Sequence, residues 1–170
     1  MKKIILSGYM GSGKSTVGVL LAKASGLPFI DLDTIIETRT GKSIPELFVE
    51  GEIKFRKTEH NILYEIINQD SSFVLSMGGG TPCYADNHKV LQRDDVISIY
   101  LKTNINTIIT RIDNNKQERP LLKNLHPEEK TEYIAKHLFD RSYFYMQSKH
   151  IVTTDNKTPE DIVNEIMSIL

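Results

Sequence analysis

The sequence has a single cysteine, Cys83, so no internal disulfide can form. One cysteine also cannot build the multi-cysteine cluster of a structural zinc site. The five histidines are scattered and lack the HExxH spacing of a zinc hydrolase, so we interpret them as structural or surface residues. Composition therefore excludes a disulfide framework and a cysteine metal cluster.

An excess of charge of either sign is also lacking. The 21 basic and 22 acidic side chains give a net charge of −1. A protein that binds nucleic acid through its phosphates usually carries a clear excess of lysine and arginine. We therefore expect no nucleic-acid partner.

Long apolar runs are absent as well. The opening MKKIIL ends its apolar run at Leu6, and Lys14 follows soon after. A signal peptide needs an uninterrupted apolar stretch of ~7–15 residues, and a membrane span needs ~20. We expect a cytoplasmic protein with no membrane partner.

The chain does contain short apolar runs that alternate with segments of helical periodicity. Such alternation predicts βαβ units, and hence an α/β fold whose parallel sheet is covered on both faces. With 170 residues the chain is long enough for one domain with a full core. The expected strands lie at 4–6, 28–33, 72–77, 96–101 and 150–154.

Helix signals fill the intervals between these runs. Gly26 is placed to cap a helix that begins after Lys14, and Thr158 is placed to begin the last one, before Pro159. A mostly helical stretch is expected from about 34 to 68. The polar segment 113–126 is long for a compact domain and is typical of a lid.

The stretch GYMGSGKST, from Gly8 to Thr16, fits the pattern G-x-x-x-x-G-K-[ST] at every fixed position. It follows an expected strand and opens an expected helix, which is the context of a phosphate-binding loop. In such a loop, backbone N–H groups and the helix N-terminus hold phosphates, Lys14 reaches the β- and γ-phosphates, and the Ser15 hydroxyl ligates Mg²⁺. The alternative, a glycine-rich turn without a ligand, fits this context poorly.

Two carboxylates could complete the metal and proton chemistry. Asp31 and Asp33 end the second expected strand, where alternation would place both on one side. One could organise Mg²⁺, and the other could accept or orient the proton of an attacking hydroxyl. The alternative is that one of them, Asp33 in particular, only caps the following helix.

Several further charged or flexible positions have both a functional and a simpler interpretation. Glu52, Arg56 and Glu59 share one helical face, and taken alone this pattern favours a solvated charge ladder. Arg119 falls in the expected lid. It could bring positive charge to a phosphoryl group during transfer, or it could simply face solvent. Arg141 interrupts an apolar helical stripe and therefore needs an anionic partner.

The glycine run at the end of the third expected strand also has two interpretations. Gly78, Gly79 and Gly80 suggest close approach of a ligand or of another chain segment. The simpler alternative is a tight turn.

Taken together, these motifs resemble the shikimate kinase family over essentially the whole chain. The matching features are GxxGxGKST, DLD, GEIKFRKTE, SMGGG, RPLL and RSYFY in this order. Met77 departs from the pattern, because a smaller residue is expected before the glycines, and it could alter the packing of a pocket. The resemblance implies a three-layer αβα P-loop NTPase fold, like that of nucleoside monophosphate kinases, with a five-stranded parallel sheet. Within the single domain 1–170 it implies a core (1–33, 71–112, 148–170), a substrate-binding region (34–70) and a lid (about 113–126).

The resemblance also implies the reaction, which is ATP- and Mg²⁺-dependent phosphorylation of the 3-hydroxyl of shikimate in chorismate biosynthesis. It implies that Lys14, Asp33 and Arg119 are catalytic. It also implies that Ser15 and Asp31 bind Mg²⁺, with Ser76 contacting the ion through water. The implied shikimate contacts are Asp33, Arg56, Gly78, Gly79, Gly80 and Arg141, with Glu59 orienting Arg56. The implied ATP contacts are Gly11, Ser12, Gly13, Lys14, Ser15, Thr16, Arg111 and Arg119, with adenine near Arg111 and the loop before Pro159.

Two other functions share some of these features. A related small-molecule kinase, such as a gluconate kinase, would have the phosphate loop but not the two carboxylate-binding arginines in this order. A nucleotide-binding switch would need neither Asp33 nor a lid arginine. The expected partners are ATP and shikimate only, and we expect a monomer.

Overall fold

A five-stranded parallel sheet forms the centre of the protein, in a computed structural model that describes residues 1–114, 122 and 125–170. The strands lie in the order β2-β3-β1-β4-β5, and each neighbouring pair is parallel. The strands are β1 (Lys3–Ser7), β2 (Phe29–Asp31), β3 (Phe73–Ser76), β4 (Val96–Lys102) and β5 (His150–Thr153). The predicted five-stranded parallel sheet is confirmed.

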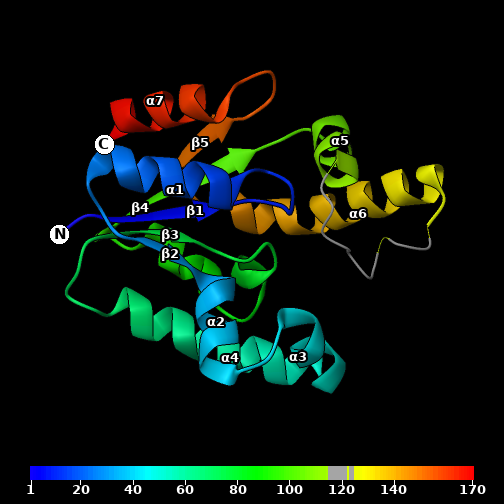
Figure 1. Cartoon of the computed structure of the whole chain (residues 1–170), viewed down its shortest axis with the longest axis horizontal. Coiled ribbons are helices and arrows are strands. Elements are labelled where there is room, and N and C mark those ends of the chain that lie inside the picture. The colour runs from blue at the N-terminus through cyan, green and yellow to red at the C-terminus, as the bar shows by residue number, and fades with distance from the viewer. Residues whose placement is uncertain (115–121, 123–124) are drawn as a thin grey trace.

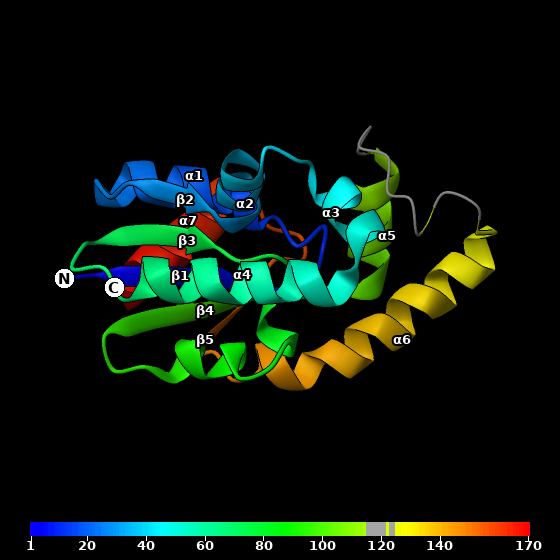
Figure 2. The ribbon, with the colours of Figure 1, turned by 90° about the horizontal axis from the view of Figure 1, so that it is seen from below.

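Helices connect the strands and cover both faces of the sheet (Figures 1 and 2). The α-helices are α1 (Lys14–Ser25), α2 (Leu32–Thr40), α3 (Ile44–Glu50), α4 (Glu52–Ile67), α5 (Ile105–Asn114), α6 (Pro127–Tyr145) and α7 (Pro159–Ile169). Two short 3₁₀ helices, η1 (Thr81–Cys83) and η2 (Asn87–Gln92), follow β3.

Alternation along the strands creates two separate apolar layers. In β1, Ile4 and Leu6 pack with the apolar sides of α1 and α7, whereas Ile5 packs with α2, α4 and η2 on the opposite face. All three side chains are fully buried. Because successive strand residues point to opposite faces, one strand serves both cores. The three-layer αβα architecture follows.

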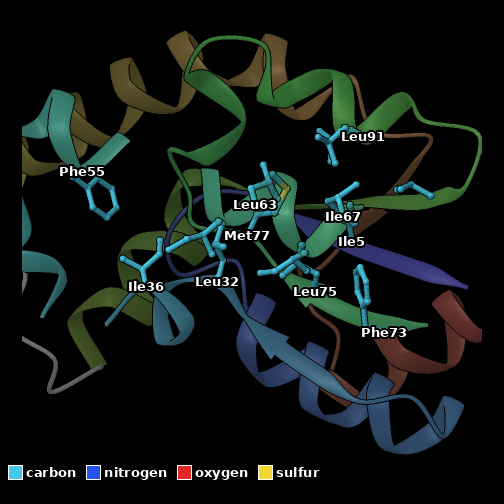
Figure 3. Close-up of a cluster of buried hydrophobic side chains, with 14 of the residues drawn as sticks. Ile5, Leu32, Ile36, Phe55, Leu63, Ile67, Phe73, Leu75, Met77 and Leu91 are labelled. Atoms are coloured by element: carbon cyan, nitrogen blue, oxygen red, sulfur yellow. The ribbon is translucent and has the colours of Figure 1, made fainter. Parts of the chain in front are cut away.

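Met77 belongs to the second of these cores, together with Leu32 and Leu63 (Figure 3). Its side chain is only 1% exposed. The thioether therefore fills apolar space next to the end of β3. An unbranched, flexible side chain suits such an irregular gap.

The predicted helix boundaries at Gly26 and Thr158 are confirmed. Gly26 ends α1 with φ 68°, a left-handed conformation that glycine adopts without steric cost. Thr158 begins α7, where its hydroxyl accepts from the backbone N–H of Asp161 and the Asp161 carboxylate accepts from the N–H of Thr158. This reciprocal capping box is what the residues TPED predict.

The second strand is shorter than the sequence predicts. It ends at Asp31, and α2 begins at Leu32, so Asp33 lies in the first turn of a helix and not on a strand. Asp31 causes the change, because its carboxylate accepts from the backbone N–H of Thr34 (3.3 Å) and so caps α2. The interpretation that both aspartates share one side of a strand is therefore wrong.

A third apolar cluster lies beyond the carboxyl ends of the strands, where α5 and α6 pack together (Figure 1). It includes the buried Tyr9 of the phosphate loop, Ile108 of α5 and Ile134 of α6. This cluster supports the phosphate loop through Tyr9. In the described part of the chain, no helix combines the length and apolar character needed to cross a membrane.

Candidate active site

The glycine-rich loop joins the carboxyl end of β1 to the N-terminus of α1. Gly11 (φ 77°) and Gly13 (φ 95°) adopt left-handed conformations that L side chains rarely adopt, which lets the backbone curl around the helix end. Gly13 is the N-cap of α1. The first backbone N–H groups of a helix lack partners within it, so they are free to bind an anion such as phosphate.

Lys14 folds over this loop. Its ammonium donates to the backbone carbonyls of Gly8 (2.8 Å) and Tyr9 (2.9 Å). These two contacts place the positive charge at the loop's concave side. A phosphate group held by the loop would therefore lie beside the Lys14 charge.

Ser15 and Asp31 lie together beside the loop. The Ser15 hydroxyl donates to the Asp31 carboxylate at 2.9 Å. Asp31 is next to Ser76 in the sheet register, so the expected metal-site residues gather at one edge of the sheet. A hydroxyl and a carboxylate are the hard oxygen donors that Mg²⁺ prefers, and Mg²⁺ usually takes only one or two carboxylates and fills its other positions with water and phosphate. The donor set thus fits Mg²⁺, and within the described residues no group of three or more His, Cys, Asp or Glu forms a site for another ion.

Asp33 sits in a crowded acidic environment. Burial is the largest of the causes that raise the pKa of its carboxyl from 3.8 to about 6, and the nearby carboxylates Asp31 and Glu59 add to the rise, while Lys14 opposes it. A carboxylate with a raised pKa is a stronger base than an exposed one. Asp33 is therefore suited to take a proton at neutral pH, when it is still mostly ionised.

Arg56 and Glu59 of α4 form a shielded ion pair. The Arg56 guanidinium donates to the Glu59 carboxylate at 2.7 Å, and the Glu59 side chain is only 1% exposed. Glu52 lies farther from Arg56, at 3.8 Å. The interpretation of these three residues as a solvated charge ladder is wrong, because tertiary packing buries the Glu59 end of the helix face.

Arg141 approaches the same region from α6. Its guanidinium lies 5.9 Å from the ring centre of Tyr9, within the range of a cation–π contact. On the same helix, Tyr145 donates to the backbone carbonyl of Gly79 (2.6 Å) and ties α6 to the glycine run. Burial raises the pKa of the Tyr145 hydroxyl, so it remains a donor.

Each glycine of the run 78–80 meets a different part of the site. A Cβ on Gly78 would lie 3.0 Å from the Asp33 carboxylate, and one on Gly79 would lie 3.4 Å from the Arg141 guanidinium. A Cβ on Gly80 would lie 2.8 Å from Cζ of Arg56. The tight-turn interpretation is thus incomplete, because the missing side chains also leave room for these three charged groups.

The two arginines share a cavity of about 280 Å³ at this end of the molecule. Two basic groups opening onto one small hollow are suited to bind a small carboxylate, since an arginine can give a carboxylate two parallel hydrogen bonds. The residues that line it are Glu52, Ile53, Arg56, Gly80, Cys83, Tyr84 and Arg141. Cys83 is partly buried, and burial raises the pKa of its thiol, which favours the protonated form.

Arg111 of α5 lies behind the phosphate loop. Its guanidinium donates to the backbone carbonyls of Gly11 and Ser12 (both 3.3 Å) and to the hydroxyl and carbonyl of Thr154 (both 3.2 Å). It therefore bridges the loop to the segment before α7, where the sequence predicts the adenine contacts. Arg119 lies outside the described residues.

Sequence reasoning missed some of the residues that complete the site. Thr81 is fully buried against Glu59, and nothing in the sequence marks it. Helical spacing places Tyr145 in the apolar stripe that Arg141 interrupts, with Ile134 and Leu138, whereas in the structure its hydroxyl holds the glycine run. The only sequence signal for Tyr145 is its place in RSYFY, four residues after Arg141.

Comparison with known proteins agrees with this geometry. A shikimate kinase family model matches residues 10–170. The chain is 54% identical to a shikimate kinase of Flavobacterium psychrophilum, covering 100% of this chain and 99% of that protein. Among solved structures, a Bacteroides thetaiotaomicron shikimate kinase superposes with a TM-score of 0.91 at 35% identity (98% and 97% of the two chains).

A second solved structure carries a ligand in its description. It is the shikimate kinase of Acinetobacter baumannii in complex with shikimate, which is 34% identical to this chain, with a TM-score of 0.85 over 98% of this chain and 91% of that one. The similarity in sequence extends across the whole chain and the similarity in structure includes the sheet and its helices. The chain therefore belongs to the shikimate kinase family.

Proposed function

We propose that this protein transfers the γ-phosphoryl group of ATP to the 3-hydroxyl of shikimate, giving shikimate 3-phosphate and ADP. The observation that carries the proposal is the pair of arginines, Arg56 and Arg141, at one small cavity close to Asp33 and the phosphate loop. Shikimate is a small ring with one carboxylate and several hydroxyls. The arginines would bind the carboxylate, and the glycine run would approach the ring.

In the proposed reaction the phosphate loop and Lys14 hold the β- and γ-phosphates of ATP. Asp33 accepts the proton of the 3-hydroxyl, or orients that hydroxyl, as its oxygen bonds to the γ-phosphorus. The bond from the γ-phosphorus to the β–γ bridging oxygen breaks, and ADP leaves. Mg²⁺, held by Ser15 and Asp31, would neutralise charge on the phosphates.

Substrate positioning follows from charge and shape. The carboxylate would bind to Arg56 and Arg141 at the end of the cavity away from the loop, which directs the hydroxyls toward Asp33. We further propose that 34–70 form the substrate-binding region of a single, monomeric domain. Arg56, which would bind the carboxylate, and its ion-pair partner Glu59 both belong to that segment.

Release of ADP by the purified protein tests the reaction. With ATP and Mg²⁺, we expect shikimate to raise the rate strongly, while gluconate, quinate and adenosine monophosphate leave it near the rate without acceptor. The position of the phosphate on the product is checked by NMR. A strong response to gluconate would favour the related small-molecule kinase, and equal rates with no acceptor would favour the nucleotide-binding switch.

Replacing Gly80 with alanine tests the carboxylate site. We expect the KM for shikimate to rise about tenfold or more, because the new methyl group would displace the Arg56 guanidinium from its place beside Glu59. Stability should also fall, although Gly80 has φ −91°, which alanine adopts freely, because moving the guanidinium leaves the buried Glu59 carboxylate without its cation. Steady-state kinetics and thermal unfolding check both effects.

A Gly26→Ala variant is the matched control. Gly26 has open space around it but a left-handed φ of 68°, so alanine there should lower the unfolding temperature and leave the KM for shikimate unchanged. If both variants lower stability and neither raises the KM, the assigned role of Gly80 is wrong.

A further inference from the structure

A chain of buried polar side chains lies beneath Arg56 and leads away from the cavity. Glu59 of α4, Thr81 of η1 and Asn87 of η2 are each at most 1% exposed. The large majority of polar groups buried this deeply have their hydrogen bonds satisfied, and their arrangement then has little freedom. The contacts among these buried side chains therefore fix the position of the Arg56 guanidinium.

The central contact is between Thr81 and Glu59. The Thr81 hydroxyl donates to Oε1 of Glu59 at 2.6 Å, while the Arg56 guanidinium donates to Oε2 of the same carboxylate at 2.7 Å. One carboxylate thus has a separate partner for each oxygen. With the Thr81 bond in place, rotation of the carboxylate would break a buried hydrogen bond, so Oε2 stays directed at Arg56.

Thr81 itself is held by its surroundings. Its backbone N–H donates to the carbonyl of Gly78 (3.1 Å), and its own carbonyl accepts from the Asn87 side-chain amide (2.8 Å). The amide oxygen of Asn87 lies 2.7 Å from Nδ1 of His60 on α4. The network therefore starts at Glu59 and ends at His60, both on α4, and passes through η1 and η2. These contacts hold Thr81 in one position relative to α4.

We propose that Thr81 is a positioning residue for recognition of the substrate carboxylate, acting through Glu59 on Arg56. This inference rests on the proposed function, since it takes the carboxylate of shikimate as the ligand of Arg56. The Thr81 hydroxyl bonds to Glu59, and Thr81 is not among the groups assigned to the reacting hydroxyl or the phosphates. Its hydrogen bond determines where the guanidinium is held before the substrate arrives, and preorganisation of this kind lowers the cost of binding.

The test replaces Thr81 with valine, which keeps the shape of the side chain and removes the hydroxyl. We expect the KM for shikimate to rise about tenfold, which corresponds to loss of one charge-assisted hydrogen bond in the network. The kcat and the KM for ATP should stay within about twofold of the wild-type values. Thr81→Ser, which restores the hydroxyl, should recover most of the affinity for shikimate.

The methyl ester of shikimate separates positioning from a general structural role. The ester lacks the negative charge that Arg56 would bind, so its inhibition constant should be nearly the same for wild type and Thr81→Val. Loss of the same factor for shikimate and for its ester would overturn the proposal, as would an unchanged KM for shikimate. If the valine variant does not fold, Thr81→Ala carries the same comparison.

Two controls make the outcomes distinct. Ser98 on β4 is also fully buried, and its hydroxyl donates to the carbonyl of Leu91 and accepts from the backbone N–H of Lys149. Ser98→Ala should lower stability without changing the KM for shikimate. Wild-type activity on shikimate is measured first, so failure of the proposed reaction appears in the wild-type protein, whereas failure of the Thr81 inference appears only in the variants.

Discussion

An Asp33→Asn variant is expected to lose about three orders of magnitude in kcat with shikimate, which is within the range of a lost general base. The amide is close to the carboxylate in size but cannot accept the hydroxyl proton. The KM for shikimate should change much less, because Arg56 and Arg141 would still bind the substrate carboxylate. Steady-state and single-turnover kinetics at pH 7.5 check this split.

The same substitution is expected to stabilise the protein at neutral pH. The Asp33 pKa rises from 3.8 to about 6 on folding, so the folded state binds this proton more tightly than the unfolded state does. Above pH 6 the ionised carboxylate therefore opposes folding, by about 3 kcal/mol. As the pH falls from 6 to 4 this penalty disappears.

Urea unfolding in metal-free buffer measures the effect on stability. The free energy of unfolding of Asp33→Asn should exceed that of the wild type at pH 7.5, and the two values should converge near pH 4. Asp70→Asn is the control, because Asp70 is exposed near the far end of α4 and should change neither activity nor stability. A variant with wild-type kcat would refute the catalytic role of Asp33.

Lys14→Met is expected to lower kcat by about two to three orders of magnitude, the loss typical of removing one preorganised charged donor at a reaction centre. Methionine retains most of the side-chain length but no charge. It cannot balance the negative charge that moves between the γ- and β-phosphates during transfer. Kinetics with varied ATP separate this loss from the smaller rise expected in the KM for ATP.

Stability should fall modestly in this variant, because the Lys14 ammonium also holds the carbonyls of Gly8 and Tyr9. Lys23→Met is the matched control, since Lys23 is exposed in the last turn of the same helix α1. Equal loss of kcat in both variants would contradict the assigned role, as would full activity in Lys14→Met.

Much of the fold was predictable because its signals are local. The phosphate loop places a glycine wherever the backbone is left-handed, and no distant residue is needed to recognise it. The caps at Gly26 and Thr158 depend on residues only a few positions apart. The five strands follow from short apolar runs, with ends that differ by one or two residues.

The second strand shows where local signals compete. DLD continues the alternation of a strand, but an aspartate is also a strong helix cap, and capping by Asp31 ends the strand two residues early. The sequence assigns the capping alternative to Asp33, whereas Asp31 takes it. Both aspartates remain beside the phosphate loop, because strand and helix meet at the same edge of the sheet.

The phosphate loop, the alternation of strands and helices, and the family resemblance can all be recognised in the sequence, because each depends on residues close together or on fixed motifs. Which charged side chains are buried, and which groups they contact, depends on the tertiary structure. Glu59 looks exposed in a helical pattern, and only the packing of η1 against α4 buries it and brings Thr81 to its carboxylate. The cost of burying a charge depends on its neighbours in space, and for Glu59 one of these is 22 residues away along the chain.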